Sequence, residues 1–158
     1  MPSGTVPSTR SADAETPDHP REGSPFALGL LLRRAHDRVA TAMDQALAPF
    51  EIERRHLMVL MRLHAAGALT QRDLVEQTDH DKASIVRIVD DLERLHLASR
   101  ELVPGDRRLR AVTLTDHGRD VLSRARDAAQ PAEAAATTAL TDAERHQLQH
   151  LLRMMTTD

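Results

Sequence analysis

The sequence has no cysteine, tryptophan or tyrosine, and its phenylalanines are only Phe26 and Phe50. Without cysteine the chain can form no disulfide, no thiolate metal site and no thiol-based peroxide sensor. With so few aromatic rings it lacks the stacking surfaces on which proteins bind single-stranded nucleic acid. No apolar run is long enough for a membrane span, and residues 1–24 lack the apolar middle of a secretory signal. These absences favour an unexported, cytoplasmic protein.

The sequence also lacks an excess of positive charge. The formal net charge is −3 at pH 7, so any contact with nucleic acid must come from local basic patches. Because single strands are disfavoured, duplex DNA is the expected form. The 158 residues are 41% hydrophobic, which suits one globular domain with a core and leaves little room for a second.

The first 24 residues are rich in proline, serine, threonine and charge, which predicts a disordered tail over 1–24 and a single domain over 25–158. Ser24 and Pro25 form a helix start, and a helix is predicted over about 25–48. Its apolar residues recur at helical spacing: Leu28, Leu31, Leu32, Ala35, Val39 and Met43. A second helix is predicted from about residue 53 to 64, before Gly67.

Two closely spaced helices are predicted in the middle of the chain. Thr70 caps a short helix to about residue 77, and Asp81 opens a longer one to about residue 95. The longer helix turns an apolar stripe inward, consisting of Ile85, Ile88, Val89, Leu92 and Leu95. Two helices joined this tightly are typical of a helix-turn-helix.

The opposite face of the longer helix suits duplex DNA. Small Ala83 lets the helix lie deep in the major groove, while Lys82 and Arg87 can reach phosphate or guanine. Ser84 can donate to a phosphate, and Val86 can touch a thymine methyl group. The predicted DNA contacts on the two helices are Gln71, Lys82, Ala83, Ser84, Val86 and Arg87. The alternative is an ordinary amphipathic helix with a solvated charged face.

Two short strands are predicted over 98–103 and 109–114, with proline and glycine between them to reverse the chain. The tip of this hairpin carries Arg107, Arg108 and Arg110, long cations that could enter a narrow minor groove. Asp106 could orient one of them by a charge-assisted hydrogen bond. A solvated loop is the alternative, but the preceding helix-turn-helix favours a DNA-binding wing.

The C-terminal part is predicted to be helical from Thr115, with a kink or division near Pro131 and a capping box at Thr141–Glu144 before a last helix. The predicted fold is therefore mainly α with a small antiparallel β-hairpin. It is a winged helix-turn-helix whose DNA-binding lobe covers about 53–114, with dimerisation helices over about 25–48 and 115–156.

The stretch from Leu74 to Gly118 resembles the DNA-binding lobe of the MarR family of transcription regulators, and the flanking helices match over about residues 26–156. The motifs that carry the resemblance are Asp81–Glu93, Asp106-Arg107-Arg108 (the family's D-x-R wing) and Leu114-Thr115-Asp116-His117-Gly118 (its LT-x-x-G signature). The resemblance implies that Arg108 is the wing-tip arginine and Asp106 its positioning partner.

Four residues depart from the family pattern. Asp79 and His80 fill a turn that often contains glycine, and His96 stands where glycine usually follows the recognition helix. Val86 replaces a common threonine, so its contribution should be apolar and directed to thymine.

The first and last predicted helices carry apolar stripes outside the compact lobe, and a two-fold dimer would cover them. The predicted dimerisation residues are Leu28, Leu31, Leu32, Leu148, Leu151, Leu152 and Met155. The resemblance implies the same arrangement, in which two lobes bind half-sites of a near-palindromic operator. A monomer whose terminal helices pack on its own lobe is the alternative.

The resemblance also implies a small-molecule effector, phenolic or carboxylate, bound between the dimerisation helices and the lobe. His36 is the first candidate contact, with Arg33, Arg34, Arg55 and His56 as further ones. The alternative for each is ordinary: a lone histidine beside an apolar face is often a satisfied core residue, and exposed arginines are often only solvated.

The function expected from these features is sequence-specific binding of double-stranded DNA by an effector-released repressor. The alternative is a winged-helix module that acts constitutively or through protein contacts. No phosphate-binding glycine loop, nucleophile elbow or metalloprotease pair is present, so no catalytic residue, cofactor or enzyme activity is expected. His146 and His150 have the spacing of metal ligands, but without a clear third ligand they are better interpreted as solvated, and no metal site is expected.

Overall fold

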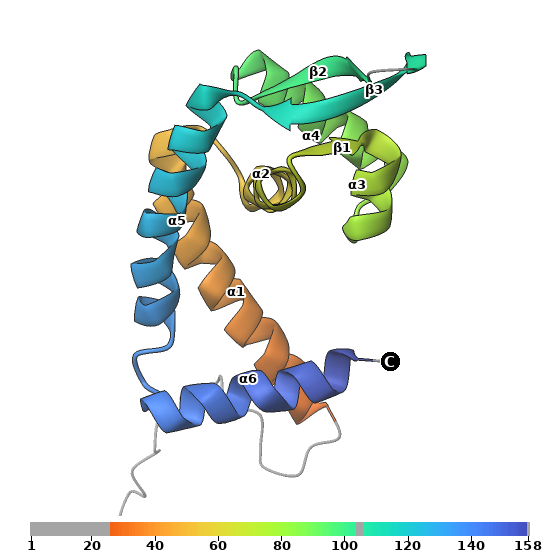
Figure 1. Ribbon diagram of the computed structural model, residues 1–158. Coiled ribbons are helices and arrows are strands. Elements are labelled where there is room, and N and C mark those ends of the chain that lie inside the picture. The colour runs from red at the N-terminus through yellow and green to blue at the C-terminus, as the bar shows by residue number, and fades with distance from the viewer. Residues whose placement is uncertain (1–25, 104–105, 158) are drawn as a thin grey trace, which may run out of the picture. The chain divides into compact units, whose positions relative to one another are not determined.

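The computed structural model of the chain describes residues 26–103 and 106–157, and the side chains of Val103, Asp106, Arg107, Arg108 and Glu133 lie outside the described part. The predicted tail, residues 1–24, also lies outside it. Two compact units can be distinguished, with their boundary inside the first helix, between Ala35 and His36. The elements follow the predicted order of helices and hairpin, with one strand added (Figure 1).

Helix α1 (Ala27–Leu47) is followed by a 3-10 turn, η1 (Ala48–Phe50), with proline in its first turn. The helix thus ends close to Pro49, as predicted, because a proline cannot continue the backbone hydrogen bonds of a helix. Within the second unit α1 buries Ala40 and Leu47.

The lobe contains three helices and three strands. They are α2 (Arg54–Ala66), β1 (Ala68–Thr70), α3 (Gln71–Gln77), α4 (Lys82–Arg94), β2 (Ala98–Val103) and β3 (Asp106–Leu114). The predicted caps are confirmed: the Thr70 hydroxyl accepts from the Asp73 N–H, and the Asp81 carboxylate accepts from the Ser84 N–H at 2.7 Å. Gly67 ends α2 with a positive φ of 81°, a conformation that glycine adopts without strain.

The sheet is antiparallel, with β3 between β1 and β2. The sequence did not predict β1, which pairs Leu69 with Val112. β3 starts earlier than the predicted residue 109, because Asp106 already pairs with Val103.

One apolar core joins α2, α3, α4, the sheet and the start of α5. The inward stripe predicted for α4 is confirmed: Ile85, Ile88, Val89 and Leu92 are buried, and Leu95 packs against them partly buried. In Figure 1, α2 is seen end-on below the sheet, and α4 lies behind the sheet. One face of α4 is therefore buried in the core, and the opposite face is exposed to solvent.

A tight junction joins the end of α4 to the start of α5. His96 adopts a left-handed φ of 57°, the conformation for which glycine is favoured after a helix. Thr115 donates its hydroxyl to the His96 carbonyl at 2.7 Å and its N–H to the Leu97 carbonyl at 3.1 Å. A Cβ on Gly118 would collide with the Leu97 carbonyl, which explains the glycine of the LT-x-x-G motif.

The C-terminal helices are α5 (Asp116–Ala136) and α6 (Asp142–Thr156). Pro131 lies inside α5 without dividing it. The predicted capping box of α6 is confirmed, since the Glu144 carboxylate accepts from the Thr141 N–H and hydroxyl, both at 2.8 Å. Among the helices in the described part of the chain, none is long and apolar enough to traverse a lipid bilayer.

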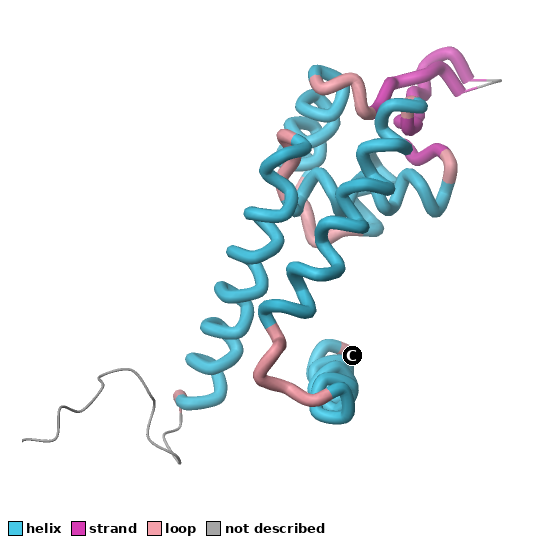
Figure 2. Tube along the Cα trace, turned by 90° about the vertical axis from the view of Figure 1, so that its left-hand side faces the viewer, coloured by secondary structure: helices cyan, strands magenta, loops and turns pink. Residues whose placement is uncertain are grey.

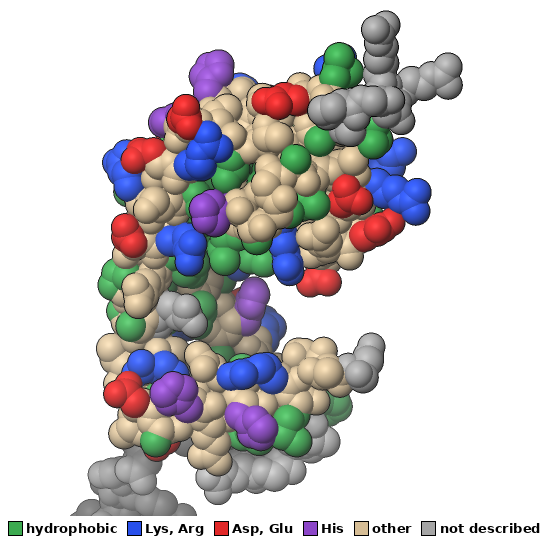
Figure 3. Space-filling view, in the orientation of Figure 1, with side chains coloured by type: hydrophobic (Ala, Val, Ile, Leu, Met, Phe, Trp, Pro, Cys, Tyr) green, Lys and Arg blue, Asp and Glu red, His purple; other side chains and the backbone are tan. Residues whose placement is uncertain are grey.

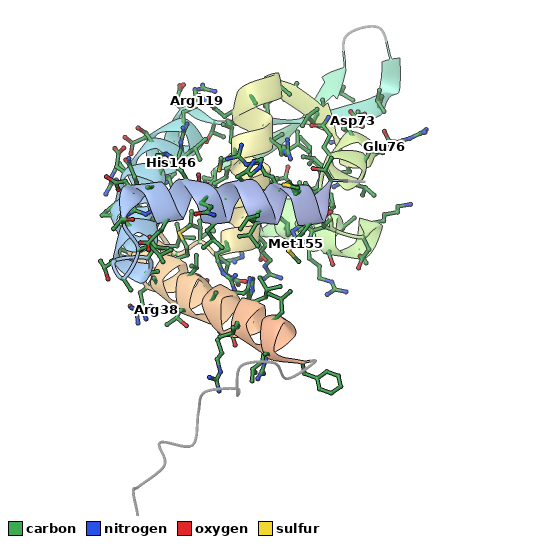
Figure 4. All side chains as sticks on the ribbon, turned by 90° about the horizontal axis from the view of Figure 1, so that it is seen from below. Arg38, Asp73, Glu76, Arg119, His146 and Met155 are labelled. Carbon is green, nitrogen blue, oxygen red and sulfur yellow. The ribbon has the colours of Figure 1, made fainter. Side chains whose placement is uncertain are left out.

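No residue of α6 is buried. Its large apolar side chains stand open to solvent: Leu148, Leu151, Met154 and Met155 are 38 to 64% exposed. Figure 4 looks onto this helix, with His146 near one end and Met155 near the other. In the other unit, Phe26, Leu28 and Leu31 of the α1 region are also exposed.

Candidate nucleic-acid interface

The first two turns of α4 present the predicted DNA-reading face. Lys82, Ala83 and Arg87 are exposed, whereas Ser84 and Val86 are half-buried. The Asp81 carboxylate also contacts the Ser84 hydroxyl at 3.2 Å. Hydrogen bonds from the Ser84 N–H and hydroxyl hold the pKa of Asp81 below its ordinary value, so this cap stays ionised at neutral pH.

The charged residues in the two halves of α4 differ in whether they form ion pairs. In its second half, Asp90 accepts from Arg100 at 2.6 Å, and Asp91 accepts from Arg94 at 3.1 Å. In its first half, neither Lys82 nor Arg87 forms an ion pair with a residue in the described ranges. The two unpaired cations flank the small Ala83, so the N-terminal half is the one suited to phosphate and base edges.

Arg100 ties the wing to the helix-turn-helix. From β2 its guanidinium contacts Asp90 and Glu93 of α4, and its N–H donates to Glu93 at 2.9 Å. In the amide orientation that satisfies both groups, the Gln71 oxygen accepts from Arg100 Nη2 at 2.7 Å. Gln71, a predicted DNA contact, is therefore engaged within the protein.

Sequence reasoning missed Arg100. The available signal was the pair of acidic residues three apart on α4, Asp90 and Glu93, ahead of an arginine in the strand. That spacing places two carboxylates on one helix face.

The predicted wing is confirmed as a β-hairpin, and Figure 2 shows it projecting from one edge of the lobe. Arg110 and Leu109 of β3 are exposed, and so is Leu102 of β2. The backbone of Asp106, Arg107 and Arg108 belongs to β3, but their side chains lie outside the described part. On the face in Figure 3, acidic and basic side chains are interspersed over the lobe, in keeping with the net negative charge.

The candidate effector residues fall in both units. Arg33, exposed, and Arg34, half-buried, precede the boundary, while His36 follows it and is exposed. Arg55 lies at the start of α2, with its Nε 2.9 Å from a Glu53 carboxylate oxygen. It also borders an open hollow lined by Asp44, Glu53, Arg54, Arg55, Met58 and His80.

His56 differs from the other candidates because it is buried, at 3% exposed. Its Nδ1 accepts the N–H of Glu53 at 2.9 Å, and its Nε2 lies 3.5 Å from Asp91 on α4. Burial lowers the pKa of His56 below its ordinary value, and neighbouring Arg55 lowers it further against the opposing pull of Glu53 and Asp91. The ring is thus neutral at pH 7.

A helix-turn-helix followed by a projecting hairpin defines the winged helix class of DNA-binding proteins. The model of the MarR family matches residues 50–109. The HTH-type transcriptional repressor NicR of Pseudomonas putida is 30% identical over 140 residues, which are 86% of this chain and 89% of that protein. The chain belongs to the MarR family, whose members are transcription regulators and not enzymes.

Solved structures agree on the fold. A mutant MarR from E. coli complexed with operator DNA superimposes with a TM-score of 0.77 at 23% identity, covering 85% of this chain and 99% of that one. BpsR of Bordetella bronchiseptica, whose DNA binding is regulated by 6-hydroxynicotinic acid, gives 0.74 at 30% identity, covering 83% and 94%.

Proposed function

We propose that this regulator is a homodimeric repressor that binds a near-palindromic operator and is released by a small phenolic or carboxylate effector in the cytoplasm. The observation that carries the DNA-binding part is the N-terminal half of α4, where Lys82 and Arg87 stand unpaired among the described residues, beside small Ala83. A repressor role is supported by the similarity to NicR.

In the proposed complex, α4 lies in the major groove and the wing in the adjacent minor groove. Lys82 and Arg87 contact phosphate or guanine, and Val86 and Ala83 contact thymine methyl groups. The wing contributes Asp106, Arg107, Arg108 and Arg110. Gln71 and Ser84 complete the interface, each already held by a partner in the protein.

The proposed dimer explains the exposed apolar residues of the terminal helices. A helix such as α6 that buries none of its residues gains little stability within its own chain. A second copy would cover Leu148, Leu151 and Met155 from α6 and Leu28 and Leu31 from α1. Leu32 and Leu152, both half-buried, complete the proposed interface.

The proposed effector contacts are His36 first, then Arg33, Arg34, Arg55 and His56. Exposed His36 and the arginines can receive a carboxylate or phenolate. The compound that regulates DNA binding by BpsR, 6-hydroxynicotinic acid, carries both a carboxylate and a ring hydroxyl and is a suitable first probe.

The DNA contacts are tested by titrating selected genomic fragments at several salt concentrations with Arg108→Ala. Loss of one phosphate or minor-groove contact should weaken binding about tenfold and lower the salt slope by about one. Arg126→Ala, an exposed arginine on α5, is the matched control and should bind as wild type does. Equal titration curves for wild type and Arg108→Ala at every salt concentration would contradict the wing's role.

The effector site is tested by adding 6-hydroxynicotinic acid to the preformed DNA complex. His36→Ala should resist release while binding DNA normally without the probe, because only the ligand contact is removed. His146→Ala, an exposed histidine on α6, serves as control. Equal sensitivity of His36→Ala and wild type would remove His36 from the site.

A further inference from the structure

His56 is the single polar or charged side chain in the buried core of the described residues. Its neighbours along α2, Leu57, Val59 and Leu60, are apolar and buried as expected. Burying an imidazole costs free energy unless hydrogen bonds replace those to water. The position therefore needs a physical reason beyond packing.

The first contact of the ring fixes its tautomer. Nδ1 accepts the N–H of Glu53 at 2.9 Å, while the Glu53 carboxylate accepts the N–H of His56, which completes a capping box at the start of α2. A nitrogen that accepts a hydrogen bond carries no hydrogen, so the neutral ring must carry its hydrogen on Nε2.

The second contact reaches the recognition helix. Nε2 is buried, makes no hydrogen bond to a described residue and lies 3.5 Å from Oδ2 of Asp91 on α4. Asp91 also accepts from Arg94 at 3.1 Å and lies 3.8 Å from Arg55. Interactions with Arg94 and His56 lower the pKa of Asp91, so it faces the ring as a carboxylate.

We infer that His56 is a positioning residue for DNA recognition: its Nδ1 accepts the hydrogen bond that caps the start of α2, and its Nε2–H faces the Asp91 carboxylate of the recognition helix at 3.5 Å, an electrostatic contact. This inference rests on the proposed DNA binding. The ring joins the segment that follows α1 to the helix whose outer side carries Lys82 and Arg87. Its electrostatic contact with Asp91 adds to the apolar packing of α4 on α2.

Protonation breaks this arrangement. A second hydrogen would have to sit on Nδ1, where it would oppose the N–H of Glu53, so the imidazolium cannot keep the α2 cap. The charged groups that act on the ring are Glu53 and Arg55 from its own segment and Asp91 from α4. DNA affinity should therefore fall in mild acid through this ring.

Two substitutions separate the two contacts. Gln can accept from the Glu53 N–H and donate to Asp91 without titrating, whereas Glu keeps the cap acceptor but offers no donor and adds charge beside Asp91. We expect His56→Glu to fold and to bind operator DNA about tenfold more weakly at pH 7.5. His56→Gln should recover most of that loss.

The decisive measurement is operator affinity from pH 7.5 to 5.5 for wild type and His56→Gln. Wild-type affinity should fall more steeply than that of the variant, since every other titrating group is the same in both. His64→Gln, an exposed histidine in the last turn of α2, is the matched control and should follow wild type.

The inference is overturned if folded His56→Glu binds as tightly as wild type, or if the ratio of the wild-type and His56→Gln affinities is constant over this pH range. Thermal melting of each variant separates misfolding from loss of positioning. If His56→Glu does not fold, the pH comparison of wild type with His56→Gln decides. Failure of wild type to retain any genomic fragment at any pH overturns the proposed function instead, and it is seen before any variant is compared.

Discussion

Helices α4 and α6 have similar sequence patterns and opposite surroundings. Both are amphipathic, and both start at a side-chain cap, Asp81 for α4 and Thr141 for α6. The apolar stripe of α4 is buried by its own chain, whereas α6 buries no residue. An amphipathic pattern thus shows that a helix has an apolar face to bury. Whether the same chain buries that face depends on the rest of the fold.

We expect the largest effects from matched truncations of an apolar side chain on α4 and on α6. Ile88→Ala empties a fully buried site and should lower the free energy of unfolding by about 2–5 kcal/mol. Leu151→Ala, at a side chain 48% exposed, should instead raise the dissociation constant of the proposed dimer roughly tenfold while the lobe stays folded.

Denaturant unfolding followed by circular dichroism measures the first effect, and sedimentation over a dilution series measures the second. A Leu151→Ala protein that stays dimeric at the same dilutions as wild type would mean that α6 is not covered by a second copy.

A second pair of variants compares a glycine of α5 that packs against the lobe with a glycine of α1 that faces open space among the described residues. Gly118→Ala places a methyl group against the Leu97 carbonyl and should destabilise the lobe by about 1–3 kcal/mol, since backbone has to move. Gly29→Ala in α1, where a Cβ meets no atom within 4 Å, should change stability by less than about 1 kcal/mol, and toward stabilisation. Similar melting temperatures for Gly118→Ala and Gly29→Ala would contradict this difference between the two glycines.

The smallest predicted effect is on the pH dependence of stability. Because the pKa of His56 is lowered in the folded protein, the unfolded chain binds more protons below about pH 6.5. Stability should therefore be constant in this respect above that pH and decline as the pH falls below it. The pKa values of Asp73, Asp81 and Asp91 are also lowered, so their contributions are lost only below about pH 4.

Denaturant midpoints from pH 7.5 to 5 measure this decline. His56→Gln should flatten it, because the variant has no ring to protonate. An equal slope for wild type and variant would assign the decline to other groups.

The features predicted correctly from sequence are local ones. Caps at Thr70, Asp81, Thr115 and Thr141 involve residues three apart, so their signals lie within a single turn. The inward stripe of α4 follows from helical period alone. The hairpin follows from strand patterns on either side of proline and glycine.

The features that sequence reasoning misses depend on partners distant in sequence. β1 is only three residues long and exists because β3 offers it an edge, which no local pattern shows. Arg100 meets carboxylates seven and ten residues earlier, across an element boundary. The sequence offers His56 only as one of several candidate effector contacts, and its burial against Asp91 depends on the packing of α2 on α4.

The junction of His96, Leu97, Thr115 and Gly118 has a consequence for how an operator could be released. Thr115, the N-cap of α5, is hydrogen-bonded to His96 and Leu97, which directly follow the recognition helix, so a tilt of α5 would act on the end of that helix. At 1.5 Å per residue α5 is roughly 30 Å long, so a tilt of about 5° at one end displaces the other by about 3 Å. In a dimer, the tilt of α5 would then set the distance between the two recognition helices, and the DNA-contacting face of each helix would stay unchanged.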